Sequence, residues 1–152
     1  MVKAVKIAAR NNVEDDGPSI LHNAEVTLAD YSGYRYMREN PVYVNKKGAT
    51  GTKIIRVACS NSETRIEMEC EAGVANDGVY IKGSTYIKGN KGGKQSLVSV
   101  QNVTMAPART NIPWPYQKLR FALIFPALPD EAKEFDLIEP SNTWQFKDIK
   151  CK

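Results

Sequence analysis

The sequence predicts an all-β fold, an antiparallel sandwich or barrel, from two observations. From about residue 20 onward, short segments alternate apolar with polar residues, which is the period of a half-buried strand. Turn-forming residues separate these segments at intervals of about 8–12 residues, as in sandwiches and barrels. The 152 residues are 42% hydrophobic and 25% charged, which is typical of a folded domain. We expect one domain, residues 1–152, in which residues 1–20 form a flexible or peripheral segment.

The charge balance and the longest apolar runs bear on the partners. Lysine and arginine total 21 against 17 acidic residues, a net charge of +4. This small excess favours solubility and does not indicate a polyanionic partner. The longest apolar runs, such as residues 121–125, are far shorter than the roughly 20 residues that cross a bilayer. We therefore expect no membrane span.

A β-hairpin is the clearest element. Residues 64–71 alternate apolar with charged side chains, which gives a strand one buried and one solvated face. Residues 53–60 alternate in the same way, and a turn centred on Ser62 and Glu63 separates the two segments. Matching the apolar faces predicts a register with Cys59 opposite Ile66, Val57 opposite Met68, and Ile55 opposite Cys70.

This register decides the state of two of the three cysteines. Cys59 and Cys70 are offset by four residues, about 13 Å along the strand, whereas a disulfide needs about 7 Å or less. We expect both to be reduced and buried. No pair among Cys59, Cys70 and Cys151 has the Cys-x-x-Cys spacing of a redox pair or a zinc site.

Further strands are predicted downstream. They cover residues 78–82, 85–88, 95–101, 103–105, 118–125 and 143–147 with Ile149, and weaker signals cover residues 24–28 and 41–44. The strand 118–125 places Phe121 on its apolar face, so we expect Phe121 in the core and Arg120 in solvent. Only residues 129–134 have the pattern of a helix, and it is a short one.

Residues suited to catalysis or metal binding are few. His22 is the only histidine and lies in a polar stretch, so we expect it at the surface. The acidic residues near the C-terminus fit the start of a short helix and the solvated loop after it better than a catalytic carboxylate pair; they are Asp130, Glu131, Glu134, Asp136 and Glu139. Residues 15–17 lack the spaced ligands of a calcium loop, and residues 89–93 open no helix that could hold phosphate. We therefore expect that the chain is not an enzyme and that it binds no metal and no cofactor.

Binding to single-stranded nucleic acid is one alternative. An OB-like face would need aromatic and basic residues together on exposed strands. The residues that could supply it are Tyr80, Tyr86, Lys82, Lys88, Lys91 and Lys94. Interspersed glutamates and the small net charge favour a solvated strand face instead. An enzyme of unrecognised type, the other alternative, would need a cleft lined by ionisable groups.

The candidate ligand-binding residues are Trp114 and Tyr116. They lie in the segment 112–116, which Pro113 and Pro115 stiffen. Exposed aromatic rings could stack on a sugar or on an apolar protein surface. Alternatively, one or both rings close the open end of the core. The sequence leaves both interpretations open.

Three groups of motifs give the chain a family resemblance. The first pairs Ile54-Ile-Arg-Val57 with residues 61–68, and the second pairs Gly83-Ser-Thr-Tyr-Ile-Lys88 with residues 92–94. The third joins Leu119-Arg-Phe-Ala-Leu-Ile-Phe-Pro126 and residues 128–129 with residues 135–139 and 144–149. From about residue 40 to its end, the chain resembles an extracytoplasmic β-sandwich domain of Bacteroidetes-type secreted proteins. That domain often stands N-terminal to a TlpA-like thioredoxin module.

The resemblance implies an immunoglobulin-like β-sandwich that acts as a non-enzymatic binding or structural accessory domain. Its partner would be a protein or a carbohydrate of unknown identity. The motifs are structural, and they bring no catalytic residue with them. Lys3, Lys6 and Arg10 interrupt the apolar N-terminal stretch, so no signal peptide is recognisable. An extracytoplasmic location therefore requires that the chain is a mature form, and the cytoplasm is the alternative.

Overall fold

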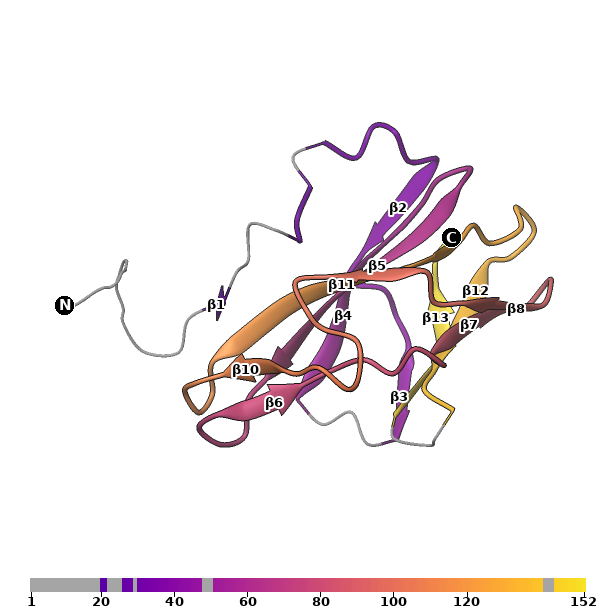
Figure 1. The fold of residues 1–152 in the computed structure, drawn as a ribbon. Coiled ribbons are helices and arrows are strands. Elements are labelled where there is room, and N and C mark those ends of the chain that lie inside the picture. The colour runs from indigo at the N-terminus through magenta and orange to yellow at the C-terminus, as the bar shows by residue number, and fades with distance from the viewer. Residues whose placement is uncertain (1–19, 22–25, 29, 48–50, 141–143) are drawn as a thin grey trace.

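A computed structural model describes residues 20–21, 26–28, 30–47, 51–140 and 144–152 (Figure 1). In these residues every regular element is a β-strand, and the strands form three sheets. Strand pairs are antiparallel, except that β1 (Ile20–Leu21) runs parallel to β11 (Lys118–Pro126). The prediction of an all-β, antiparallel fold is therefore confirmed.

The first sheet has six strands, with β5 (Glu63–Glu71) at its centre. β11 pairs with one side of β5 and β4 (Thr52–Cys59) with the other. β2 (Tyr36–Glu39) forms the edge beyond β4. β1 and β9 (Ser99–Gln101) both pair with β11 on the side away from β5.

The second sheet has five strands, and the third has two. The order in the second sheet is β3 (Val44–Lys47), β13 (Gln145–Lys150), β12 (Glu134–Ile138), β7 (Tyr86–Gly89) and β8 (Lys94–Ser96). The third sheet pairs β10 (Thr110–Ile112) with β6 (Asp77–Val79), and Figure 1 shows it as a separate ribbon pair.

One hydrophobic core lies between the first and second sheets. The first sheet contributes Phe121 and Phe125 from β11, and the second contributes Phe135 and Phe146 from β12 and β13. Phe121 is 3% exposed, so its predicted core position is confirmed. Two sheets that bury their apolar faces against each other form a β-sandwich.

The hairpin forms, but in a different register from the predicted one. Cys59 pairs with Thr64 and Val57 with Ile66, two positions away from the expected partners. The tight turn is the reason: the amide of Ser60 donates a hydrogen bond of 2.9 Å to the carbonyl of Glu63, which leaves only two residues in the loop. A shift of two residues keeps every side chain on its original face, so the alternation alone cannot distinguish the two registers.

A β-bulge near the start of β4 changes which isoleucine faces the core. The pairing passes from Ile54 opposite Met68 to Arg56 opposite Glu67, so Ile55 is the extra residue. A bulge reverses the inward and outward positions on one side of it. As a result Ile54, and not Ile55, packs in the core with Val57.

The charged face of β5 is buried, although the alternation predicts a solvated face. Val26, Tyr31 and Tyr34 supply groups that bind residues of this face. Arg65 Nη2 donates to the carbonyl of Val26, and the phenol of Tyr31 donates a hydrogen bond of 2.5 Å to Glu67 Oε2. Val26, Arg65 and Glu67 all have less than 5% of their surface exposed. Both faces of the central strand are therefore covered, one by apolar and one by polar groups.

Two further predictions are wrong for identifiable reasons. The predicted strand 95–101 is divided between β8 and β9, which lie in different sheets, because Leu97 hydrogen-bonds to Thr85 and Val98 to Ile124. The predicted helix over residues 129–134 is only a turn, in which the amide of Ala132 donates a hydrogen bond to the carbonyl of Pro129. A helix this short forms too few hydrogen bonds to offset the free-energy cost of nucleating it.

The remaining weaker signals have mixed outcomes. Residues 103–105 form only an isolated bridge, between Met105 and Ile81. The strand expected at 41–44 begins instead at Val44, and residues 26–28 are not a strand. β2, β10 and β12 are strands that the alternation does not predict. The predictions for residues 1–19 and for His22 lie outside the described residues.

Candidate functional site

The loop that carries Trp114 and Tyr116 connects β10 to β11. It lies beside the loop of residues 72–76, which connects β5 to β6. The amide of Tyr116 donates a hydrogen bond of 2.9 Å to the carbonyl of Ala72, and the amide of Asn76 donates one of 3.1 Å to the carbonyl of Pro113. These backbone bonds hold the two loops together as one unit at one end of the first sheet.

Both predicted site residues are exposed. Trp114 has 66% of its surface exposed and Tyr116 has 61%. The interpretation that these rings close the end of the core is therefore wrong. Ile112, just before the loop, does fill the core there and is completely buried.

The backbone of Tyr116 has an unusual conformation. Its φ is +66°, in the left-handed region that a bulky side chain seldom adopts. The hydrogen bond from its amide to Ala72 and the fixed φ of Pro115 constrain the chain on this side. Residues held in this region concentrate at binding and active sites.

A third exposed apolar side chain lies in the loop that is hydrogen-bonded to the loop of the two aromatic residues. Val74, in the adjacent loop, is 63% exposed, although nothing in the sequence pattern marks it. We call Val74, Trp114 and Tyr116 the aromatic tip. Large apolar side chains that are exposed together mark interaction surfaces more often than isolated ones do.

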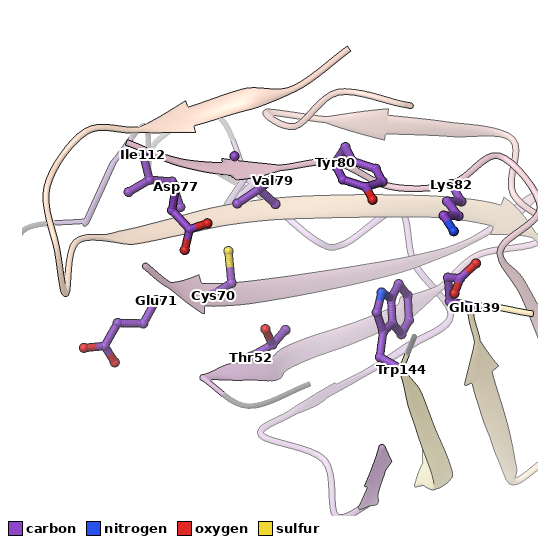
Figure 2. Close-up of a pocket in the computed structure, with 11 residues that line it drawn as sticks. Thr52, Cys70, Glu71, Asp77, Val79, Tyr80, Lys82, Ile112, Glu139 and Trp144 are labelled. Atoms are coloured by element: carbon purple, nitrogen blue, oxygen red, sulfur yellow. The ribbon is translucent and has the colours of Figure 1, made fainter. Parts of the chain in front are cut away.

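A cavity of about 320 Å³ lies between the third sheet and the ends of the strands below it (Figure 2). Val79, Tyr80 and Lys82 line one side, and Thr52, Cys70 and Trp144 line the other. Asp77 and Ile112 also line it, and they directly adjoin the two loops of the aromatic tip. Sequence reasoning misses this site, because its residues come from separate segments with no motif in common.

The cavity is acidic. Glu71, Asp77 and Glu139 line it, against a single cation, Lys82. Figure 2 shows the amine end of Lys82 directed toward the carboxylate of Glu139. Burial is the main cause that raises the pKa of the Cys70 thiol, to about 12, and the negative charge of Asp77 is the second. The Cys70 thiol therefore lines the cavity in its uncharged form at ordinary pH, and it does not act as a nucleophile.

The residues of the alternative, a nucleic-acid-binding face, are divided between two parts of the fold. Tyr80 and Lys82 line the cavity, whereas Tyr86 and Lys94 belong to the second sheet. There the Lys94 ammonium lies 4.5 Å from the centroid of the Tyr86 ring. These tyrosines therefore do not form a continuous stacking surface.

The C-terminal acidic residues are dispersed as well. Asp130 pairs with Arg35, Glu134 with Lys150, and Asp136 with Lys147. Glu131 is exposed, and only Glu139 lies in the cavity. No group of three or more potential metal ligands is present among the described residues.

The three cysteines are free and buried, as predicted for Cys59 and Cys70. Burial raises the pKa of Cys59, and it raises the pKa of Cys151 to about 11. In the part of the chain that the structure describes, no helix is both long and apolar enough to cross a bilayer. Comparison with known proteins finds no matching family model, curated protein or solved structure.

Proposed function

We propose that this chain is a non-enzymatic binding domain that recognises a partner protein through its aromatic tip. The observation that carries the proposal is the exposure of Val74, Trp114 and Tyr116 together, each with more than 60% of its surface in solvent. Exposing a large apolar side chain forgoes stabilisation of about 1.5–3 kcal/mol that burial would supply. A surface that keeps three of them together is best explained by burial against a partner.

The construction of the loop supports binding. Two prolines and two inter-loop hydrogen bonds limit the conformations of residues 113–116, so little entropy is lost when a partner immobilises them. Tryptophan and tyrosine are the residues most enriched among the hot spots of protein interfaces.

A protein fits the tip better than a carbohydrate does. Stacking on a sugar uses aromatic faces, and the aliphatic Val74 beside the rings adds nothing to it. A protein surface buries aliphatic and aromatic side chains alike. Carbohydrate binding is therefore an outcome of the test below and not part of the proposal.

The remaining charged and reactive groups give further support. Arg65 and Glu67, two of the most buried charged side chains, pair with each other and do not line the cavity. The thiols are buried and have raised pKa values, which makes them unreactive in an oxidising or a reducing compartment. The proposal also includes an extracytoplasmic location and an immunoglobulin-like topology. The family resemblance is the support for both.

Substitution at the tip tests the proposal. Trp114→Ala and Tyr116→Ala should leave the melting temperature within a few degrees of that of the unmodified chain, because both rings are exposed. A protein partner captured from the source cells, then purified, should bind Trp114→Ala about thirtyfold more weakly, the loss typical of a hot spot. Val98→Ala is the matched control, since Val98 is as exposed as the tip residues but lies between β8 and β9.

Three results would overturn the proposal. The first is a partner that binds Trp114→Ala and Val98→Ala equally well. The second is binding of purified glycans, but of no protein, in a way that depends on Trp114. The third is a sharp fall in the melting temperature of Trp114→Ala, which would mean that the ring is packed in the core.

A further inference from the structure

The cavity beside the aromatic tip has the size of a small-molecule site. Its volume of about 320 Å³ lies at the lower end of the range of about 300–1,000 Å³ usual for ligand pockets. Apolar groups of Val79 and Ile112 and the polar ends of Asp77, Tyr80 and Lys82 line it together. A mainly apolar surface with a few convergent polar groups is the usual composition of such a site.

The charge of the cavity opposes that of the whole chain. The chain carries a net charge of +4, yet Asp77 directs a carboxylate into the cavity, whereas the one ammonium group of the lining, that of Lys82, is directed toward Glu139 (Figure 2). Among the described residues, Asp77 and Glu71 take part in none of the ion pairs. Asp77 accepts only a backbone hydrogen bond of 3.2 Å, from the amide of Gly73. A cleft with an excess of one charge attracts ligands of the opposite charge.

An indole ring lies at the other end of the cavity from this carboxylate. Figure 2 shows Asp77 directed into one end of the cavity and Trp144 on the opposite side. Trp144 is half-buried, and its ring lies 5.8 Å from that of Phe146, so the core holds it in place. Tryptophan is the most effective partner of cations among the aromatic residues.

Tyr80 completes the aromatic lining. Its ring is positioned by the guanidinium of Arg109, which lies 4.8 Å from the ring centroid. Its hydroxyl group points toward the interior of the cavity (Figure 2). A carboxylate with an indole and a phenol around one small cavity is the arrangement that holds alkylammonium and guanidinium groups in proteins.

We infer that this cavity binds a small organic cation, whose alkylammonium or guanidinium group pairs with Asp77 and whose apolar part extends toward Trp144. An anion would be repelled by the carboxylate of Asp77. A neutral sugar would leave the charge of Asp77 without a counterion. The inference goes beyond the proposed function and is independent of it, since the aromatic tip does not line the cavity.

The test uses a fluorescent reporter that is already in the cavity. The chain has two tryptophans, so Trp114→Phe leaves Trp144 as the only indole. This variant is titrated at pH 7 with n-butylammonium, n-butanol and butyrate, which have nearly the same shape and differ in charge. Methyl glucoside is the neutral sugar probe. Heteronuclear NMR on the same samples locates the shifted amides.

The cation should change the emission of Trp144 and bind at least about tenfold more tightly than the alcohol or the carboxylate. Asp77→Asn should weaken n-butylammonium binding by about tenfold, because a charge-assisted bond becomes a neutral one. Asp148→Asn is the matched control: the same change is made at an exposed carboxylate of β13, where asparagine also tolerates the φ of +56°. It should not change the affinity.

Several outcomes would overturn the inference. They are equal affinity for the three isosteric probes, tighter binding of methyl glucoside or butyrate, and equal effects of Asp77→Asn and Asp148→Asn. Cation-induced shifts confined to amides far from residues 77–82 would also overturn it. Because the reporter lacks Trp114, none of these results depends on whether the tip binds a protein.

Discussion

Arg65 Nε donates a hydrogen bond of 2.8 Å to Glu67 Oε2, and the two side chains are only 2% and 1% exposed. Both residues lie on β5, two positions apart, and therefore on the same face of the central strand. Arg56 on β4 pairs with the other oxygen of Glu67, Oε1, and the phenol of Tyr31 donates to Oε2. The outer face of the first sheet is thus a closed polar layer, held by residues from three segments.

Neutralising Glu67 should destabilise the protein strongly. In Glu67→Gln the positive charge of Arg65 stays buried while its carboxylate partner is lost. Removing one member of a buried ion pair costs about 3–5 kcal/mol of unfolding free energy. Urea unfolding measures this loss. Glu131→Gln, at an exposed glutamate, should change stability by less than about 0.5 kcal/mol, and equal effects of the two substitutions would contradict the buried network.

Alkaline pH should release the contact between Tyr34 and Glu63. The phenol donates a hydrogen bond of 2.7 Å to the carboxylate. Burial is the main cause that raises the pKa of Tyr34, to about 12, and this hydrogen bond is the second. The unfolded chain loses the proton near pH 10, at the ordinary tyrosine pKa of about 10. The stabilisation is therefore complete below pH 10 and is lost as the pH rises toward about 12.

Comparison with Tyr34→Phe isolates this contribution from the lysines that titrate in the same range. The difference in unfolding free energy between the two proteins should be constant from pH 7 to 9 and should shrink between pH 10 and 12. A difference that stays constant up to pH 12 would show that the phenol does not donate to Glu63.

The native protein should resist thiol reagents. Cys59, Cys70 and Cys151 are free and buried, and burial is the main cause that raises the pKa of each. Titration with a chromogenic disulfide at pH 8 should detect no thiol in the folded state and three in guanidinium. Ser62→Cys, in the exposed hairpin turn, should add one thiol that reacts at once. Rapid native labelling of Cys59 or Cys70 would contradict the register of β4 and β5.

The two faces of β11 should differ in their sensitivity to substitution. Phe121→Ala removes a buried ring and should cost about 3–5 kcal/mol of unfolding free energy. The alternation predicts that Arg120 lies in solvent. In the structure, however, Arg120 Nε donates a hydrogen bond of 2.9 Å to the buried carboxylate of Glu69. Arg120→Ala should therefore cost about 1–3 kcal/mol, because Glu69 loses a charged partner.

The pKa of Glu69 provides an independent measurement of this pair. Burial acts to raise the pKa, but the hydrogen bond from Arg120 and the charge of Lys53 outweigh it, so the pKa is lowered. NMR titration should find that the pKa rises in Arg120→Ala. An unchanged pKa, or a loss of stability as large as in Phe121→Ala, would contradict the arrangement on this face.

Much of the sandwich is determined by sequence patterns that act over a few residues. Alternation marks β4, β5 and β11, and it places Phe121 in the core. Proline and aromatic residues mark the loop of Trp114 and Tyr116 as a candidate binding site. The strand predictions succeed because a strand has a period of two residues, so local composition is enough to assign a side chain to one face.

Only the tertiary structure decides what each face meets. The hairpin register differs by two residues from the predicted one, since a shift of two preserves the apolar face and the turn at Ser60 selects between the alternatives. The charged face of β5 is buried because Val26 and Tyr31, far away in sequence, bind over it. No periodicity within a strand can encode a covering segment.

The same distinction applies to the two candidate sites. The sequence by itself identifies Trp114 and Tyr116, but whether these rings point into the core or into solvent depends on Ile112 filling the core before them. Val74 joins them only because two loops hydrogen-bond across about forty residues of chain. The cavity likewise brings Asp77 and Lys82, from β6 and the residues after it, together with Trp144, which precedes β13. Local patterns determine which side of a strand is apolar, and long-range packing decides which side chains remain free to bind.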